Sequence, residues 1–296
     1  MIRSLGRARL AVLGAAALFS TGGAAIKGTT LTAFQVAGFR SAVAALTLVA
    51  LLPGARRGFS RALAPAALAY AGTLVCFVVA TKLTTSAAAI FLQSTAPIWV
   101  LVLAPLLLGE QIRRRDLPLV ALAGAGLLLV FLGSRDPSAT APQPGIGNTA
   151  ALASGLFYAL LILALRGLAR GDAAGDRGAL PATVLGNALA FALCLPWSLP
   201  VAAWTGCDVV AIVYLGTIQI GFAYWLFTRA IQVLPALEAS LLVLLEPVLN
   251  PLWTWLLHGE RPSGLAALGG TVMLLALAGR TLLERPLRAP GPPPPD

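Results

Sequence analysis

The chain has 296 residues, of which 58% are hydrophobic and only 11% are charged. Soluble domains carry about 25% charged residues, so this composition excludes a soluble globular enzyme or a disordered chain and indicates a polytopic membrane protein. The net charge of +10 would suggest nucleic-acid binding in a soluble protein, but the spread of the basic residues argues against it. The three cysteines lack metal-ligand spacing, so we expect no metal site and no cofactor.

Ten apolar runs, each nearly free of charges, follow one another along the chain and are long enough to cross a bilayer as helices. They cover residues 9–26, 32–53, 64–81, 85–108, 117–134, 147–166, 180–202, 207–228, 236–258 and 263–283. The first run follows three arginines and resembles a signal peptide, but nine further spans favour a first transmembrane helix. The proline-rich tail, residues 285–296, is expected to be disordered.

The basic residues predict the orientation in the membrane, because cytoplasmic loops of membrane proteins collect Lys and Arg. If the N-terminus is cytoplasmic, sixteen of the 21 Lys and Arg residues fall on the cytoplasmic side. Four fall on the other side, namely Lys27, Lys82, Arg135 and Arg261, and Arg40 lies within a span. This bias predicts a bacterial-type inner-membrane protein with both termini cytoplasmic. It also argues against a nucleic-acid partner, because no single loop carries the excess.

Two segments of the chain repeat one another at an offset of 150 residues. The matching positions include Pro97 with Pro247, Gly109 with Gly259 and Glu110 with Glu260. The repeat predicts two five-helix halves, residues 1–134 and 147–284, joined by a linker, residues 135–146. Because five is odd, the second half enters the membrane inverted relative to the first, as in many secondary transporters that alternate around a midplane site.

The motifs that carry this repeat make the chain similar to the EamA-type family of the drug/metabolite transporter superfamily. These motifs are Ala25-Ile26-Lys27, Phe39-Arg40, Ala96-Pro97, Leu107-Leu108-Gly109-Glu110, Ala223-Tyr224, Ala230, Ala239-Ser240, Leu245-Glu246-Pro247-Val248 and Gly259-Glu260. The resemblance implies ten transmembrane helices in two five-helix repeats, with helices 1–4 and 6–9 around a central cavity. It also implies transport of amino acids, other small metabolites or drugs.

Glu246 lies near the middle of the predicted span 236–258. A carboxylate at the centre of a bilayer costs about 2.5–3.5 kcal/mol, so it must face a cavity, find a partner or be protonated. We predict that Glu246 contacts a substrate amine or couples transport to protons. The alternative is a structural hydrogen bond to backbone groups freed by Pro247.

Asn250 and Trp253 follow Glu246 by four and seven residues, so the three share one face of a helix. An acid, an amide and an indole on one stripe predict contact with a zwitterionic or aromatic ligand. The alternatives are an interhelical hydrogen bond from Asn250 and an interfacial position for Trp253.

Prolines fall at matching places in the two halves. Pro97 in the first half, and Pro247 and Pro251 in the second, are predicted to kink their helices because proline lacks an N–H group. Interrupted helices at corresponding places in two repeats indicate a binding site.

Gln93, Arg40, Gln219 and Tyr224 are further candidates for substrate binding. The buried amide of Gln93 needs several hydrogen-bond partners, and the guanidinium of Arg40 can hold a carboxylate through two parallel bonds. The alternative for Arg40 is a side chain that extends to the outer interface.

These residues predict a secondary transporter that moves a small metabolite by alternating access around a midplane cavity. An amino acid or related compound is the first candidate, and export is the favoured direction. The expected partners are the small-molecule substrate, the lipid bilayer and a proton or counter-solute, whereas the sequence does not fix the oligomeric state. The alternative is a membrane-embedded enzyme or a non-transporting scaffold. An enzyme is disfavoured because the chain has one histidine and too few groups for acid–base work, and a channel because no filter loop is recognisable.

Overall fold

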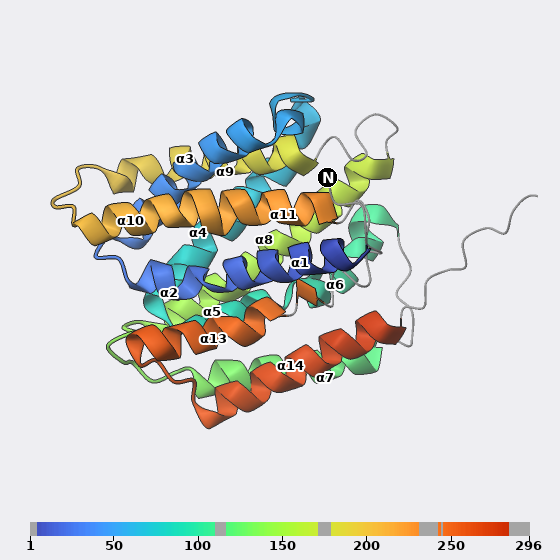
Figure 1. Cartoon of the computed structure of the whole chain (residues 1–296). Coiled ribbons are helices and arrows are strands. Elements are labelled where there is room, and N and C mark those ends of the chain that lie inside the picture. Colours follow the sequence, from blue (N-terminus) through green and yellow to red (C-terminus); the bar gives the residue numbers. More distant parts are fainter. Residues whose placement is uncertain (1–4, 110–116, 171–178, 231–241, 244, 284–296) are drawn as a thin grey trace, which may run out of the picture.

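The computed structural model describes residues 5–109, 117–170, 179–230, 242–243 and 245–283 (Figure 1). Its helices are α1 (Leu5–Ser20), α2 (Gly22–Lys27), α3 (Ala33–Leu51), α4 (Ala64–Leu83), α5 (Ser86–Gln93), α6 (Ala96–Leu108), α7 (Leu117–Gly133), α8 (Pro144–Arg170), α9 (Ala179–Ser198), α10 (Gly206–Tyr214), the π-helix η4 (Leu215–Phe222), α11 (Ala223–Ala230), α13 (Leu245–His258) and α14 (Gly264–Leu283). Two 3₁₀ turns, η1 (Pro53–Arg56) and η2 (Arg61–Leu63), join α3 to α4. No strand occurs in these described ranges, which confirms the all-α class.

Several of these helices are long and apolar enough to cross a membrane. The six spans are Leu5–Lys27, Ala33–Leu51, Arg61–Leu83, Pro144–Leu165, Leu180–Ser198 and Gly206–Phe227, and the bent pair of α5 and α6 adds a seventh if it counts as one span. The helices α7 and α14 hold shorter apolar stretches, Ala121–Gly133 and Gly264–Ala276. The predicted span 236–258 lies partly outside the described residues. The number of ten spans therefore stays a prediction.

The first predicted span consists of two helices, because the helix is interrupted at Thr21, between α1 and α2. In apolar surroundings each carbonyl that a break frees must find a donor within the protein. The hydroxyls of Ser20 and Thr21 each donate to a carbonyl three residues earlier, at 2.7 Å. The same arrangement recurs between α5 and α6, where Ser94 and Thr95 donate to carbonyls four and three residues earlier, at 2.8 and 2.7 Å.

Prolines mark the helix that carries the repeated motif in each half. Pro97 lies in the first turn of α6, directly after the break at Ser94. The axis of the bent pair α5–α6 turns by 45° near residue 101. This is four residues before Pro105, and a proline ring within a helix clashes with the carbonyl four residues earlier. In the second half, Pro247 and Pro251 both lie within α13.

Loops from both halves meet at one end of the bundle, on the left of Figure 1. Thr30 N donates to Asp208 Oδ1 at 2.7 Å, and Lys27 Nζ lies 2.9 Å from Glu260 Oε2. We call this the ion-pair end, and it comprises residues 28–32, 84–85, 134–143, 199–205 and 259–263. The helix α3 begins at this end and α9 ends there, so these two neighbouring helices run in opposite directions.

The contacts between helices keep the same pattern when the two halves are exchanged. The contacting pairs are α3 with α9, α7 with α14, α4 with α8 and α1 with α11. The pair α3–α9 joins the second helix of each half, and the pair α7–α14 joins the last helix of each half. In the pair α4–α8, the third helix of the first half contacts the first helix of the second half. In the pair α1–α11, the first helix of the first half contacts the third helix of the second half. Such an exchange is expected of two similar halves related by a two-fold axis.

The helices α7 and α14 approach closely through glycines. A Cβ added at Gly126 would lie 2.7 Å from Gly269 O, and one added at Gly269 would lie 2.5 Å from Gly126 O. Small residues let helix backbones approach in membranes, where hydrophobic attraction between helices is weak. The contact therefore depends on the absence of both side chains.

We expect Gly269→Val to lower the free energy of unfolding by about 1–3 kcal/mol, because its added carbons have no space between the two backbones. Gly124→Val is the matched control, since a Cβ added at Gly124 meets nothing within 4 Å. Thermal unfolding in detergent measures both variants. Equal midpoints for the two would contradict the close contact.

Candidate functional site

A cavity of about 160 Å³ lies inside the bundle, between helices of both halves. Its walls come from α1, α3, α4 and α5 in the first half and from α8, η4, α11 and α13 in the second. The lining residues are Phe19, Arg40, Tyr70, Thr73, Leu74, Phe77, Gln93, Tyr158, Gln219, Ile220, Tyr224, Phe227, Val243 and Glu246. A water needs roughly 10–15 Å³ of such space, so the cavity suits a molecule of about ten heavy atoms.

The structure brings together five of the seven residues that the sequence singled out for substrate binding. Arg40, Gln93, Gln219, Tyr224 and Glu246 all line the cavity. Gln219 and Tyr224 come from the continuous span Gly206–Phe227 and the other three from separate helices, and the folded bundle brings them to one internal space. Their contact with a substrate stays a prediction.

Arg40 lies inside the bundle and does not extend to an interface. Arg40 belongs to α3 and is only 2% exposed. One terminal nitrogen donates to Leu74 O at 3.3 Å, whereas Nε is buried without a hydrogen-bond partner. The guanidinium therefore keeps donor capacity beside the cavity.

Glu246 stands in the first turn of α13 and lines the cavity. It forms no hydrogen bond or ion pair with another residue in the part of the chain that the structure describes. The alternative role of Glu246, a structural hydrogen bond to backbone groups freed by Pro247, is therefore not observed among the described residues. A carboxylate that lines a cavity without such a partner is available to a ligand or a proton.

Gln219 belongs to the π-helix η4, a local distortion that often occurs at functional sites. Its Nε2 donates to Phe19 O at 3.2 Å, next to the break between α1 and α2. Its Oε1 is buried without a hydrogen-bond partner. A Cβ added at Gly22 would lie 2.8 Å from the amide nitrogen of Gln219, so a larger residue there would displace the end of the Gln219 side chain.

Gln93 is the last residue of α5 and precedes the break before α6. Its Nε2 donates to Ser154 Oγ at 2.8 Å, and Ser154 Oγ donates to Thr73 O at 2.9 Å. The chain of bonds joins α5, α8 and α4 beside the cavity. Gln93 thus contributes both to packing between the halves and to the cavity wall.

Asn250 and Trp253 do not line the cavity with Glu246, although they share its helix. Asn250 Oδ1 accepts a hydrogen bond from Ser86 Oγ at 2.5 Å, and Trp253 Nε1 donates to Ser20 Oγ at 2.8 Å. Both side chains therefore join α13 to helices of the first half. Their participation in substrate binding stays untested.

Sequence reasoning named Tyr224 but missed Tyr70, which lines the same cavity wall. Three of the four tyrosines line it, namely Tyr70, Tyr158 and Tyr224. The Tyr224 ring packs edge-on against Phe19, at 5.3 Å between centroids, and against Tyr70, at 6.2 Å. Tyrosines in the middle of apolar runs were the available signal, because tyrosines of membrane helices gather at the interfaces.

The chemistry of these side chains is that of binding through charge, hydrogen bonds and aromatic contact. Within the described ranges, no group of three or more His, Cys, Asp or Glu residues is placed to hold a metal ion. The sequence matches the EamA-like transporter family twice, over residues 7–132 and 145–281. The chain belongs to the EamA-like transporter family. This match confirms the resemblance that the repeated motifs carry.

Two further similarities agree with this assignment. A Pseudomonas aeruginosa protein, "Uncharacterized protein PA1977", is 32% identical over 272 residues, which cover 86% of this chain and 88% of that protein. A solved crystal structure aligns with a TM-score of 0.63 and 24% identity, covering 97% of this chain and 100% of the other. This structural likeness supports the fold.

Members of the EamA-like transporter family are membrane transporters rather than enzymes. The family and the apolar helices together establish a multi-pass membrane protein. A small-molecule substrate and a lipid environment follow from the family.

We expect Arg40→Met to be at least as stable as the parent EamA-like transporter. A buried guanidinium with an unpaired nitrogen opposes folding, and an apolar side chain of similar length removes that cost. Thermal unfolding in detergent measures the change, with Arg57→Met at an exposed position as the control. A loss of more than about 1 kcal/mol relative to this control would show that Arg40 serves the fold instead.

Proposed function

We propose that the protein is a secondary transporter that moves a small metabolite, an amino acid or a related compound, across the inner membrane. The cavity carries this proposal, because two opposite charges, Arg40 and Glu246, line one internal space. Burying such groups in a membrane is costly, so their position favours a role in binding. Export is the proposed direction.

The lining chemistry suits a zwitterion of modest size. The unpartnered Nε of Arg40 is available for a carboxylate. The carboxylate of Glu246, which has no hydrogen bond or ion pair among the described residues, is available for an ammonium group. The rings of Phe19, Tyr70 and Tyr224 offer an apolar wall for the rest of the ligand. An amino acid combines these three features.

Alternating access follows from two halves of similar structure. The family match falls once in each half, and the neighbouring counterparts α3 and α9 run in opposite directions. Gly109 and Gly259, 150 residues apart, both end their helices with a φ of +66°. These observations support ten spans in two inverted five-helix repeats, residues 1–134 and 147–284, with residues 135–146 as the linker.

The proposed orientation places both termini in the cytoplasm. The ion-pair end holds the loops that contain or adjoin the sparse basic residues Lys27, Lys82, Arg135 and Arg261. The positive-inside bias then directs this end away from the cytoplasm. Accessibility of single reporter tags at either terminus tests the orientation.

Solute flux in proteoliposomes that contain only this protein tests the function. We expect saturable counterflow of at least one labelled amino acid from a broad metabolite panel, and the same compound to raise the thermal unfolding midpoint in detergent. Absence of both effects across the panel would favour the alternative of a membrane-embedded enzyme or a scaffold. Flux that does not saturate would indicate a channel.

We expect Glu246→Gln to lower flux driven by a pH gradient at least about tenfold, which corresponds to roughly 1.4 kcal/mol. Glutamine keeps the shape of the side chain but neither takes up nor releases a proton. Asp136→Asn, which removes an exposed carboxylate in the loop between α7 and α8, is the matched control. Unchanged flux and unchanged pH dependence in Glu246→Gln would dismiss the coupling role.

A further inference from the structure

Lys27 and Glu260 form a buried ion pair at the ion-pair end. The two side chains are only 5% and 2% exposed, and Lys27 Nζ lies 2.9 Å from Glu260 Oε2. Lys27 ends α2 and Glu260 follows α13, so the pair joins the first half to the second. Charged side chains at the ends of membrane helices ordinarily reach water or lipid headgroups. Their burial here shows that this end of the bundle is closed.

Hydrogen bonds extend the ion pair into a network. Ser86 N donates to Glu260 Oε1 at 2.5 Å, and Ser86 Oγ donates to Asn250 Oδ1 at 2.5 Å. Lys27 Nζ also donates to Thr84 O at 2.9 Å. The end of α2 and the start of α5, both from the first half, are thereby held against α13.

A second bridge between the halves lies beside this network. Asp208, which is fully buried, accepts hydrogen bonds from Thr30 N and Thr30 Oγ1, both at 2.7 Å. Gln35 Nε2 donates to Ser198 O at 3.3 Å. Further polar contacts therefore join the two halves at the ion-pair end.

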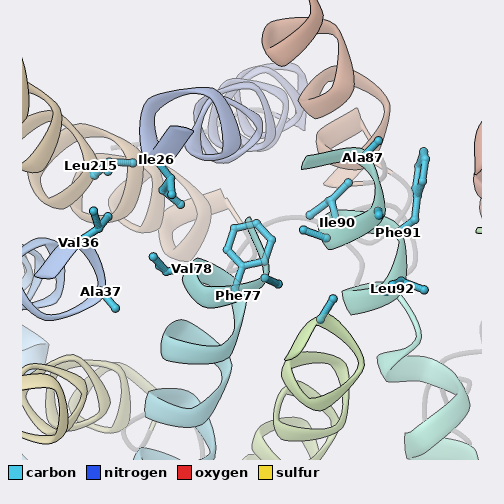
Figure 2. Packing of buried hydrophobic residues seen from close by; sticks show 14 of the residues in the cluster. Ile26, Val36, Ala37, Phe77, Val78, Ala87, Ile90, Phe91, Leu92 and Leu215 are labelled. Carbon is cyan, nitrogen blue, oxygen red and sulfur yellow. The ribbon is translucent and has the colours of Figure 1, made fainter. Parts of the chain in front are cut away.

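An apolar layer separates this network from the cavity. Figure 2 shows the Phe77 ring between Ile26 of α2 and Ile90 of α5, with Leu215 close to Ile26. Phe77 also lines the cavity, and Ile26 is the residue before Lys27. One buried apolar cluster therefore includes both a residue of the cavity wall, Phe77, and the residue next to the ion pair, Ile26.

We propose that the Lys27–Glu260 ion pair, with Ser86 and Asn250, is the gate that closes the ion-pair end of the transport pathway. The proposal rests on the transport function proposed above and adds the residues that control access from one side. It also gives Asn250 a role at the gate, separate from the cavity.

The physics of a buried ion pair suits a gate that must open in every cycle. The attraction between the charges is largely offset by the cost of removing both from water, so the closed pair is only weakly favoured over an open, hydrated one. The helix α13 links the gate to the cavity, because it carries Glu246 in its first turn and Asn250 one turn later. A ligand that moves Glu246 therefore acts on the gate through one helix.

Labelling of a cavity cysteine by a membrane-impermeant maleimide tests the gate without any measurement of transport. The reporter is Leu74→Cys, which lines the cavity, in a chain whose three native cysteines are replaced by serine. A second chain that keeps only Cys207, which is exposed at the start of α10, shows which membrane side the ion-pair end faces.

We expect Glu260→Gln to raise the rate of labelling at residue 74 from the Cys207 side by about tenfold, because loss of the ion pair shifts the population toward the open end. Lys27→Gln should act in the same direction and serves if Glu260→Gln does not fold. Asp136→Asn removes an exposed carboxylate at the same end and should leave the rate unchanged.

An unchanged rate in folded Glu260→Gln and Lys27→Gln, or an equal increase in Asp136→Asn, would overturn the gate. Solute flux of the unmodified protein is a separate readout. Absent flux with ion-pair-dependent labelling would overturn the transport function alone, whereas saturable flux with unchanged labelling would overturn the gate alone.

Discussion

The structure depends on the requirement that backbone N–H and C=O groups be paired within the protein wherever lipid excludes water. Continuous helices meet this requirement, which is why the described part of the chain is helical. At the helix breaks, the hydroxyl groups of Ser20, Thr21, Ser94 and Thr95 donate to carbonyls three or four residues earlier. The carbonyls of Leu18, Ile90 and Leu92 also accept a backbone N–H, so the hydroxyls are additional donors there. Each of these breaks adjoins a cavity residue, so the interruptions of the backbone and the candidate site coincide.

The same apolar surroundings explain the arrangement of charges. Arg40 and Glu246 line the cavity, whereas Lys27 and Glu260 pair with one another near the end of the bundle. Unpaired charges are costly in such surroundings, so their position beside a cavity supports the proposed binding role. The ion pair between Lys27 and Glu260 instead holds the two halves of the protein together. The molecule therefore has one group of charges at the cavity, suited to binding, and a second group at the ion-pair end, suited to closure.

Much of the fold was predictable because apolar runs of membrane length leave few alternatives to helices. The runs 32–53 and 180–202 correspond to α3 and α9, and the repeated motif preceded the finding that the family matches twice. The breaks within these apolar runs were harder to predict. The run Ser20-Thr21-Gly22-Gly23 is a local signal for the first break that the sequence analysis did not use. The π-helix η4 has no such run of four small or polar residues.

By itself, the sequence determined the helical class, the duplication, the family and the residue types too costly to leave in lipid. The tertiary structure decided which of those residues face one another. Asn250 and Trp253 share a helix face with Glu246, yet they bond to α5 and α1 because periodicity fixes direction only within one helix. Lys27 and Glu260 lie far apart in the chain, and no local pattern links them. Their pairing arises only when the two halves close against each other.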